Sequence, residues 1–209
     1  MRQTPRYITT DPQEVKRLAR ENPWMTYVSP TSNGMVASHY ATLLEDDPAD
    51  PDAIVLVSHF GRPDEVAHEL GRHEMLVIVQ GPHGYISPNW YAEDDIVPTW
   101  NHVTAHLYGT PEILSADDNY EVLRRLVDVF EAPMPEPRTL DVDPEGMRRL
   151  ALGTVGLRLR VTRFDARLKL SQNKPPEVRA TIIDALRGDG PYASAGLADE
   201  MERAAPPAE

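Results

Sequence analysis

The stretch that decides the fold of this chain is residues 81–91, which read GPHGYISPNWY and are followed by VPTWN at residues 97–101. Glycine permits positive φ and close backbone approach, whereas proline fixes φ at about −65° and removes a hydrogen-bond donor. Two of the three tryptophans and two of the eight tyrosines lie in this segment. The pattern predicts a rigid loop that carries flat rings, which either hold a flat ligand or a partner subunit or pack a tight corner of the core.

The composition limits the classes of protein that the chain can belong to. With 209 residues one domain with its own core is expected, and the lack of cysteine excludes disulfides, a thiolate nucleophile and cysteine-ligated metals. No apolar run approaches the roughly 20 residues of a membrane span, and the N-terminus lacks a signal-peptide core. We therefore expect a soluble cytoplasmic protein. Its net charge of −12 disfavours nucleic acid as a partner, with Arg158, Arg160 and Arg163 as the candidates for a local basic patch.

Hydrophobic patterning predicts a small barrel with peripheral helices. The expected strands are 25–29, 35–40, 53–60, 74–80, 102–108 and 155–161, and Asn33-Gly34 predicts a hairpin between the first two. Helices are expected to begin after Asp11, Ser115 and Asp143 and to cover residues 62–71 and 177–187. Residues 188–209 are rich in Gly, Ala, Pro and Glu, which predicts a disordered tail after a single domain at residues 1–187.

Four of the seven histidines do not by themselves predict a site. His102 and His106 have the spacing of metal ligands on a helix, but they lie in a strand pattern, so two histidines on a polar face are the simpler interpretation. His68 and His73 flank the end of a predicted helix, where surface residues or partners of the helix dipole are expected.

Two further histidines and one polar cluster are better candidates. His39 and His59 each end a predicted strand, where barrels place binding groups, and neutral imidazole is a common ligand of haem iron. Residues 169–174 read KLSQNK and offer a cation, a hydroxyl and two amides, either as a site or as a solvated turn. The chain has no Gly-x-Ser-x-Gly elbow, no Walker-type loop and no Gly-x-Gly-x-x-Gly motif.

Together these segments resemble the PaiB-like family, usually labelled FMN-binding negative transcriptional regulators. The matching segments are Asn22-Pro23, Ala37-Ser38-His39, Ser58-His59, residues 81–91, residues 97–101 and Lys169-Leu170-Ser171-Gln172-Asn173. They follow the family order across nearly the whole chain. The resemblance implies an α+β fold, a split β-barrel of the FMN-binding type with peripheral helices, which forms a homodimer with its cofactor at the subunit interface.

The chain departs from the family directly after His59. In split-barrel flavoproteins this segment grips the flavin phosphate, but here it carries Asp64 and Glu65 where typical members have Asn and Pro. Carboxylates in the first turn of a helix occupy the position that favours a phosphate. One branch of the family, the piperazate synthases, holds haem b instead and cyclises N5-hydroxy-L-ornithine to L-piperazic acid. The resemblance to that branch implies an enzyme that forms an N–N bond on an amino-acid substrate.

The same resemblance implies roles for individual residues. His59 is expected to ligate the iron, with His39 as its rival. Arg62 and Lys169 are expected to meet the haem propionates, Asp64 or Glu65 to hold the substrate ammonium, and Lys169 or a carboxylate to act as base. The other residues expected at the cofactor are Ser38, Tyr85, Trp90, Trp100, Ser171 and Gln172. The alternatives are an FMN-binding regulator and a flavin oxidoreductase on the same barrel.

Overall fold

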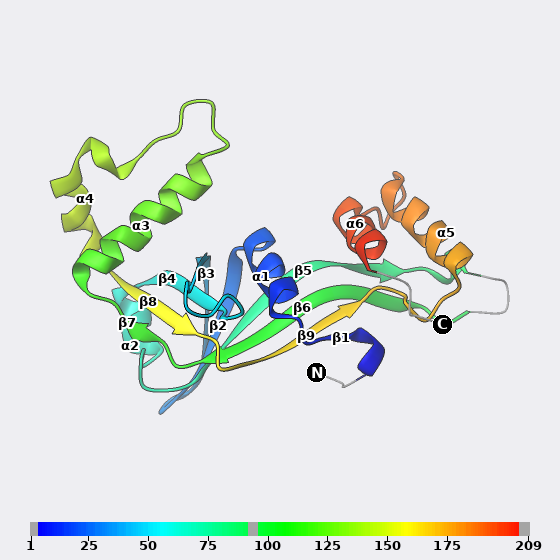
Figure 1. The fold of residues 1–209 in the computed structure, drawn as a ribbon, viewed down its shortest axis with the longest axis horizontal. Helices are drawn as coiled ribbons and strands as arrows, with labels where there is room; N and C mark the ends of the chain where they lie inside the picture. The colour runs from blue at the N-terminus through cyan, green and yellow to red at the C-terminus, as the bar shows by residue number, and fades with distance from the viewer. Residues whose placement is uncertain (1–3, 92–95, 205–209) are drawn as a thin grey trace. The chain divides into compact units, whose positions relative to one another are not determined.

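The computed structural model describes residues 4–91 and 96–204 and has an α+β fold (Figure 1). Contacts divide the chain into two compact units. Unit 1 comprises Met1–Asp11, Gln80–Ala105 and Asp165–Glu209, and unit 2 comprises Pro12–Val79 and His106–Phe164. Each unit is therefore built from segments that are distant in the sequence.

The strands form an antiparallel sheet. They are β1 (Ile8–Thr9), β2 (Trp24–Thr31), β3 (Gly34–Glu45), β4 (Val55–Gly61), β5 (Met75–Ile86), β6 (Thr99–Gly109), β7 (Glu112–Ile113), β8 (Thr154–Arg160) and β9 (Arg163–Lys169). The strand order is β1-β9-β6-β5 in unit 1 and β6-β5-β2-β3-β4-β8-β7 in unit 2, since β5 and β6 contribute residues to both units. The β1–β9, β2–β3, β2–β5, β3–β4, β4–β8 and β7–β8 pairs are antiparallel.

Six α-helices accompany the strands in the described residues. They are α1 (Pro12–Glu21), α2 (Arg62–Ala67), α3 (Ala116–Glu131), α4 (Pro144–Ala151), α5 (Pro176–Arg187) and α6 (Ala195–Arg203), with 3₁₀ turns at Pro5–Tyr7, Pro88–Trp90 and Leu140–Val142. The predicted caps Ser115 and Asp143 are confirmed, because Ser115 accepts a hydrogen bond from the amide of Asp118 and Asp143 accepts one from Gly146. These caps satisfy amides that lack a partner within their helix.

Helix α3 packs across β4 and β8 in unit 2, as Figure 1 shows. Val57 of β4 forms a core cluster with Leu114, Val122 and Leu126. The helix comes so close to β8 that a Cβ added to Gly156 would meet Cα and Cβ of Asn119 at 3.0 Å. Glycine is therefore needed at this position for the helix to reach the sheet.

The six predicted strands match β2, β3, β4, β5, β6 and β8. Four of them are longer than predicted, whereas β4 and β8 are shifted by one or two residues. The hairpin is confirmed, with Thr31 opposite Gly34 and Gly34 at a φ of 111°. The loop predicted from residue 81 is wrong in its first half, because residues 81–86 continue β5. Residues 76–78 of β5 pair with β2, and Pro82 lies beyond this pairing, so its missing amide breaks none of these hydrogen bonds.

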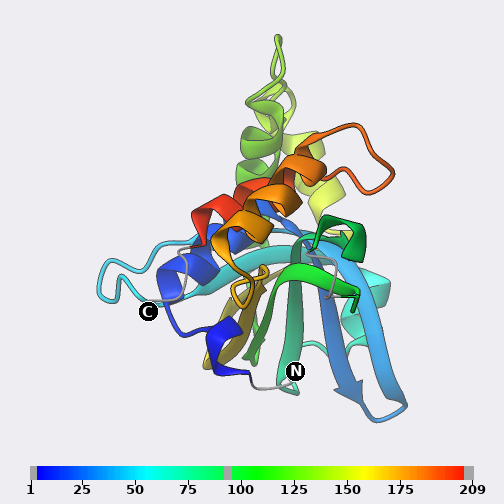
Figure 2. The same cartoon turned by 90° about the vertical axis from the view of Figure 1, so that its right-hand side faces the viewer.

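The predicted disordered tail is wrong for the described residues after 188, while residues 205–209 lie outside them. Helix α6 packs against α5, and both helices are visible side by side in Figure 2. Leu197, Ala198 and Met201 of α6 are fully buried. Composition suggested disorder because the apolar residues are few, but their spacing places them on one face of a helix.

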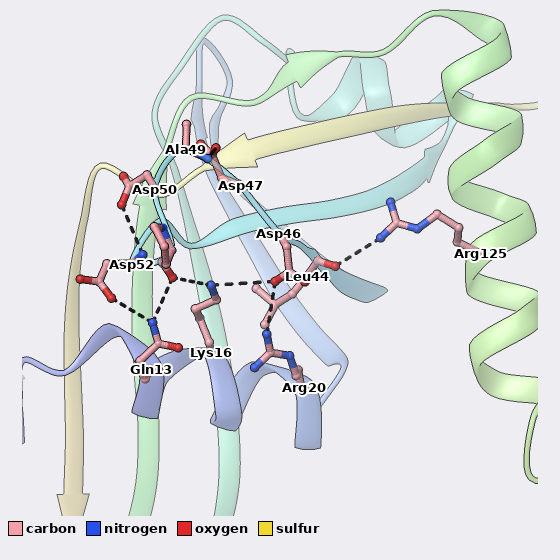
Figure 3. Close-up of polar contacts among 11 residues, drawn as sticks. Gln13, Lys16, Arg20, Leu44, Asp46, Asp47, Ala49, Asp50, Asp52 and Arg125 are labelled. Carbon is pink, nitrogen blue, oxygen red and sulfur yellow. Dashed lines mark hydrogen bonds and ion pairs between the residues drawn. The ribbon is translucent and has the colours of Figure 1, made fainter.

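The acidic segment after β3 is neutralised by nearby cations in unit 2. Lys16 and Arg20 of α1 face Asp46, and Arg125 of α3 reaches the carbonyl of Leu44 (Figure 3). The three arginines predicted as a possible basic patch are all paired with carboxylates. These pairs are Arg158 with Glu45 and Glu112, Arg160 with Asp47 and Asp50, and Arg163 with Glu74. These three arginines, which were the candidates for binding the phosphates of a nucleic acid, are therefore already paired with carboxylates.

Candidate functional site

The candidate site in unit 2 lies at the end of β4, around His59. This side chain is half-buried, and its Nδ1 atom is buried without a hydrogen-bond partner among the described residues. The ring of Tyr40 stands edge-on to it, with the ring centres 5.9 Å apart. Burial lowers the pKa of His59 below its ordinary value of 6.5. The imidazole is therefore neutral at pH 7, which is the form that binds a metal.

The sheet register places His59 on the face that α3 covers. His59 lies directly opposite Gly156 of β8, and directly opposed residues of an antiparallel pair present their side chains on the same face. Asn119 of α3 lies so close to Gly156 that a Cβ there would be 3.0 Å from its Cα and Cβ. Asn119 also has a buried atom without a partner in the described structure, its Oδ1. Two unsatisfied buried polar atoms thus share this face.

The first turn of α2 is acidic and internally paired. Arg62 forms an ion pair with Glu65 at 2.7 Å and donates from Nε to the carbonyl of Leu152 at 3.2 Å. Asp64 accepts a hydrogen bond of 2.6 Å from the Tyr40 hydroxyl, and burial together with Asp64 raises the pKa of that hydroxyl. A phosphate at this turn would face two carboxylates and one engaged guanidinium. The residues present do not fit the flavin phosphate here.

His39 and Ser38 lie in the same unit but in a different environment. His39 is exposed in the middle of β3, not at its end as predicted, and its ring stacks on Trp24 at 6.4 Å. Ser38 is bonded to His68 Nε2 at 3.0 Å, while Ser29 is bonded to His68 Nδ1 at 2.8 Å. Of the two alternatives predicted for His68, a surface residue is wrong, since only 1% of it is exposed, while its place at the C-terminal end of α2 is as predicted.

The remaining predicted residues lie in unit 1, where the two polar motifs bind each other. Lys169 donates to Thr99 and, at 2.9 Å, to the carbonyl of Trp100. The amide of Asn101 donates to Ser171 Oγ at 2.9 Å, and that hydroxyl donates to Asn101 Oδ1 at 3.2 Å. Asn101 and Ser171 are both buried. The interpretation of residues 169–174 as a solvated turn is therefore wrong at Ser171, which is buried and hydrogen-bonded to Asn101.

Backbone geometry explains why the turn after β9 needs this support. Ser171 has a φ of 58°, in the left-handed region that residues other than glycine rarely adopt. Gln172 bridges the turn, accepting from the amide of Leu170 at 2.7 Å and donating to the carbonyl of Leu168. Both side chains predicted at the cofactor thus hold the turn in place.

The aromatic side chains of unit 1 form a partly exposed group. Tyr85 contacts the rings of Trp100 at 6.1 Å and Tyr192 at 4.9 Å. Trp100 is 57% exposed, whereas Trp90 is half-buried in a 3₁₀ turn. These flat surfaces are available to a ligand or a second subunit.

The other pair of histidines follows the strand pattern. His102 and His106 lie on the less buried face of β6, while Val103, Ala105 and Leu107 point into the core. Burial and the cations Arg167, Lys169 and His83 lower the pKa of His102. The described residues contain no group of three or more acidic or histidine side chains arranged to hold a metal.

Sequence reasoning missed three polar residues beside α3: Asn119, Tyr120 and Arg148. Asn119 and Tyr120 are buried, with one polar atom each that has no partner in the described structure, and Arg148 lies over the Tyr120 ring at 4.3 Å. The spacing of Asn119 could have identified it as buried. It lies three residues before Val122 and seven before Leu126, on the apolar face of an amphipathic helix.

Comparison with solved structures defines the class of fold. The chain is similar to the FAD and heme binding protein from Mycobacterium smegmatis, with a TM-score of 0.58 and 18% identity over 78% of this chain and 73% of that one. It is also similar to the flavocytochrome Anf3 from Azotobacter vinelandii, with a TM-score of 0.53 and 15% identity over 75% of this chain and 66% of that one. The predicted fold class is confirmed: the fold is that of the flavin-binding split-barrel proteins.

The family follows from the sequence matches. The family described as "Putative FMN-binding domain" matches residues 1–163, and the chain belongs to it. A relative, Protease synthase and sporulation protein PAI 2 from Bacillus subtilis, is 30% identical over 202 residues, which cover 95% of each chain. No helix in the described part of the chain has the length and apolar character needed to span a membrane.

Proposed function

We propose that this protein is a haem-dependent enzyme that forms an N–N bond by cyclising N5-hydroxy-L-ornithine to L-piperazic acid. Two kinds of similarity support the cofactor. The chain shares its fold with a protein described as binding FAD and heme and with a flavocytochrome. It also resembles, in the motifs quoted above, the branch of its family that holds haem b.

The observation that carries the proposal is the state of His59. It is a neutral imidazole at a strand end, and its ring has no hydrogen-bond partner in the described structure at the buried Nδ1 atom. Its chemistry fits a haem ligand. The neighbouring first turn of α2 fits a phosphate poorly, because it carries Asp64 and Glu65.

The proposed reaction is redox-neutral overall. The N–O bond of the hydroxylamine breaks, a bond forms between the α-nitrogen and N5, and the oxygen leaves as water with protons from the substrate. A bound haem supplies an iron centre that polarises the N–O bond. The protein must hold both nitrogens of one molecule in attack geometry, since oriented intramolecular reactions reach effective molarities of roughly 10⁵ M or more.

We assign substrate binding, propionate binding and proton acceptance to charged side chains. Asp64 or Glu65 holds the substrate ammonium, and Arg62 meets a haem propionate. The candidate base is Lys169 or a carboxylate. Burial and the nearby Arg167 lower the pKa of Lys169, which is the direction that proton acceptance requires. Membership of a family described as FMN-binding supports a second candidate, a flavin-binding regulator or oxidoreductase.

We further propose that the protein is a homodimer. Trp90, Tyr91 and Trp100 of unit 1 are large rings, and aromatic residues are enriched in the cores of interfaces. Trp100 is exposed, as are the neighbouring Ile96 and Val97. The solution mass should therefore be that of two chains. A monomeric mass at micromolar concentration would contradict the dimer.

An absorption spectrum of the purified protein, before and after reconstitution with haem, tests the cofactor. A Soret band, together with conversion of N5-hydroxy-L-ornithine to a product one water lighter, is expected. His59→Ala should lose the Soret band or shift it strongly and lose turnover, because it removes the bond between protein and iron. His39→Ala is the matched control and should change little, since His39 is exposed on β3.

One result would overturn the proposed cofactor, and another would overturn the assignment of His59 as its ligand. Flavin absorption bands with flavin fluorescence would establish the second candidate instead. An unchanged haem spectrum and unchanged turnover in His59→Ala would make His39 the leading candidate for the ligand.

A further inference from the structure

In unit 1, helix α6 covers one face of the sheet, and a group of basic side chains lies on the other. The Asn101 amide of β6 donates to the sulfur of Met201 of α6 at 3.5 Å. A Cβ added to Gly84 of β5 would lie 3.0 Å from Leu197 of the same helix. Successive residues of a strand point to opposite faces of a sheet. His102, which follows Asn101, therefore lies on the face away from α6.

The central residue of this group is Arg167 of β9, the strand next to β6 (Figure 1). Only 9% of Arg167 is exposed, and its side chain forms no hydrogen bond or ion pair with a described residue. Its Nε atom is enclosed without a partner, whereas the two terminal nitrogens, which also lack partners among the described residues, are not enclosed. A ligand can therefore reach two adjacent nitrogens of a guanidinium whose permanent charge is not neutralised.

The surroundings of Arg167 are positively charged. Burial, and after it the charges of Arg167 and Lys169, lower the pKa of His102. Burial and the charge of Arg167 also lower the pKa of Lys169. No described carboxylate acts on either pKa. The positive charge on this face is therefore not compensated by the described residues, and it favours an anion.

The neighbouring residues on β9 do not neutralise Arg167. Asp165 precedes it by two residues on the same side of the strand, but it forms no ion pair with Arg167 or Lys169 in the described structure. Lys169 directs two of its N–H bonds at the Thr99 hydroxyl and the Trp100 carbonyl, which are neutral acceptors. Neither cation is therefore paired with a described carboxylate.

His102 supplies a further hydrogen-bonding atom near Arg167. Its Nδ1 is hydrogen-bonded to the Thr104 hydroxyl at 3.3 Å, whereas its Nε2 has no partner among the described residues and is not enclosed. Because its pKa is lowered, the ring is neutral at pH 7. When the Thr104 hydroxyl donates to Nδ1, the ring proton lies on Nε2, from which it can be donated to an anion.

We infer that Arg167 and His102 bind the carboxylate of a small organic acid. The two terminal nitrogens of Arg167 form a fork that matches the two oxygens of a carboxylate, and one negative charge neutralises the one permanent charge. A phosphate dianion needs further free donors, but Lys169 already directs two of its N–H bonds at oxygen atoms of the protein. The site goes beyond the proposed function, since the proposed reaction assigns no ligand to Arg167 or His102.

Calorimetric titration of the purified protein at pH 8 with three ligands of nearly equal size tests the site. Benzoate carries the carboxylate, benzamide is its neutral counterpart, and phenylphosphonate carries a second negative charge. Benzoate should bind about tenfold or more tightly than benzamide, because benzamide cannot form a charge-assisted pair with Arg167. Benzoate should also bind more tightly than phenylphosphonate.

Variants locate the site on the sheet. Arg167→Gln should weaken benzoate binding about tenfold or more, and it should fold, because the side chain forms no hydrogen bond with a described residue. Arg163→Gln makes the same change of charge on the same strand, at an exposed arginine that is paired with Glu74, and should leave binding unchanged. Thermal unfolding checks the fold of both variants. If Arg167→Gln does not fold, His102→Phe is the second variant, and it should weaken binding about threefold, because it removes a neutral hydrogen-bond donor.

A second titration, after reconstitution with haem, distinguishes a free acid from a carboxylate of the proposed cofactor. Benzoate binding that persists supports a site for a free acid, whereas binding that is lost supports a site for a haem propionate. Both outcomes support the carboxylate site. If the protein takes up no haem, the proposed function fails, but the first titration still tests this site.

Three results would overturn the inference. They are no measurable binding of benzoate, equal or tighter binding of benzamide or phenylphosphonate, and equal effects of Arg167→Gln and Arg163→Gln. A fourth result would also overturn it by assigning Arg167 to a carboxylate of a second copy of the chain. In that case benzoate does not bind, and Arg167→Gln lowers the solution mass from two chains to one.

Discussion

The polar cluster at the end of β9 in unit 1 and the polar cluster beside β4 in unit 2 use similar residue types for different purposes. In unit 1, Asn101 and Ser171 exchange two hydrogen bonds and Lys169 donates to two acceptors. In unit 2, His59 and Asn119 each keep a buried atom that has no partner in the described structure. A satisfied cluster fixes a fold, whereas an unsatisfied one is expected where a ligand completes it.

This difference changes which sequence motifs are interpreted as functional. The KLSQN and TWN segments are among those that carry the family resemblance, and the structure shows that they bind each other. Their first role is to hold a strained turn at Ser171. Of the unit 2 residues with a buried atom that lacks a partner in the described structure, His59 belongs to a quoted motif, whereas Asn119 and Tyr120 belong to none.

The largest effect should come from breaking the satisfied cluster. Asn101→Ala removes both bonds to Ser171 and leaves its buried hydroxyl unpaired, which should lower the free energy of unfolding by about 2 to 3 kcal/mol. Denaturant unfolding measures the loss. Asn173→Ala, at an exposed position of the same turn, is the control and should cost less than about 0.5 kcal/mol. Equal losses in the two variants would show that the cluster is not structural.

His68 in unit 2, whose two ring nitrogens are both hydrogen-bonded, should make the free energy of unfolding depend on pH. Burial lowers the pKa of His68, although Asp64 opposes the shift, so below the ordinary value of 6.5 the unfolded chain takes up a proton before the folded one does. Stability should therefore be complete above pH 6.5 and fall below it, by up to about 1.4 kcal/mol for each unit by which the pKa is lowered. Unfolding at pH 7.5, 6.5 and 5.5 measures this slope. His68→Gln should flatten it, and an unchanged slope in that variant would assign the dependence to other groups.

The smallest effect should come from the unsatisfied cluster. Tyr120→Phe removes a buried hydroxyl that has no partner in the described structure, so no hydrogen bond is lost. The free energy of unfolding should change by no more than about 0.5 kcal/mol, or rise slightly. Thermal unfolding of the two proteins side by side provides the measurement. A loss above about 1 kcal/mol would mean that the hydroxyl has a structural partner, and the contrast between the clusters would fail.

Sequence patterns predicted those elements that are stabilised by interactions between residues close together in the chain. The hairpin at Gly34, the caps at Ser115 and Asp143 and the alternating face of β6 depend on neighbours within a few residues. The motifs also identified the fold family, because they lie in order along the chain. Helix α6 was missed because its burial depends on packing against α5.

The sequence by itself determined an acidic, cysteine-free α+β chain with the motifs of a split barrel, and it singled out His59 and the carboxylates that follow it. Only the tertiary structure decided which polar atoms are satisfied. Ser38 bonds to His68, Ser171 bonds to Asn101, and Asn119 meets β8 at Gly156. These partners lie 30 or more residues apart in the chain, and hydrogen bonds over such separations depend on the fold that brings their atoms within about 3 Å.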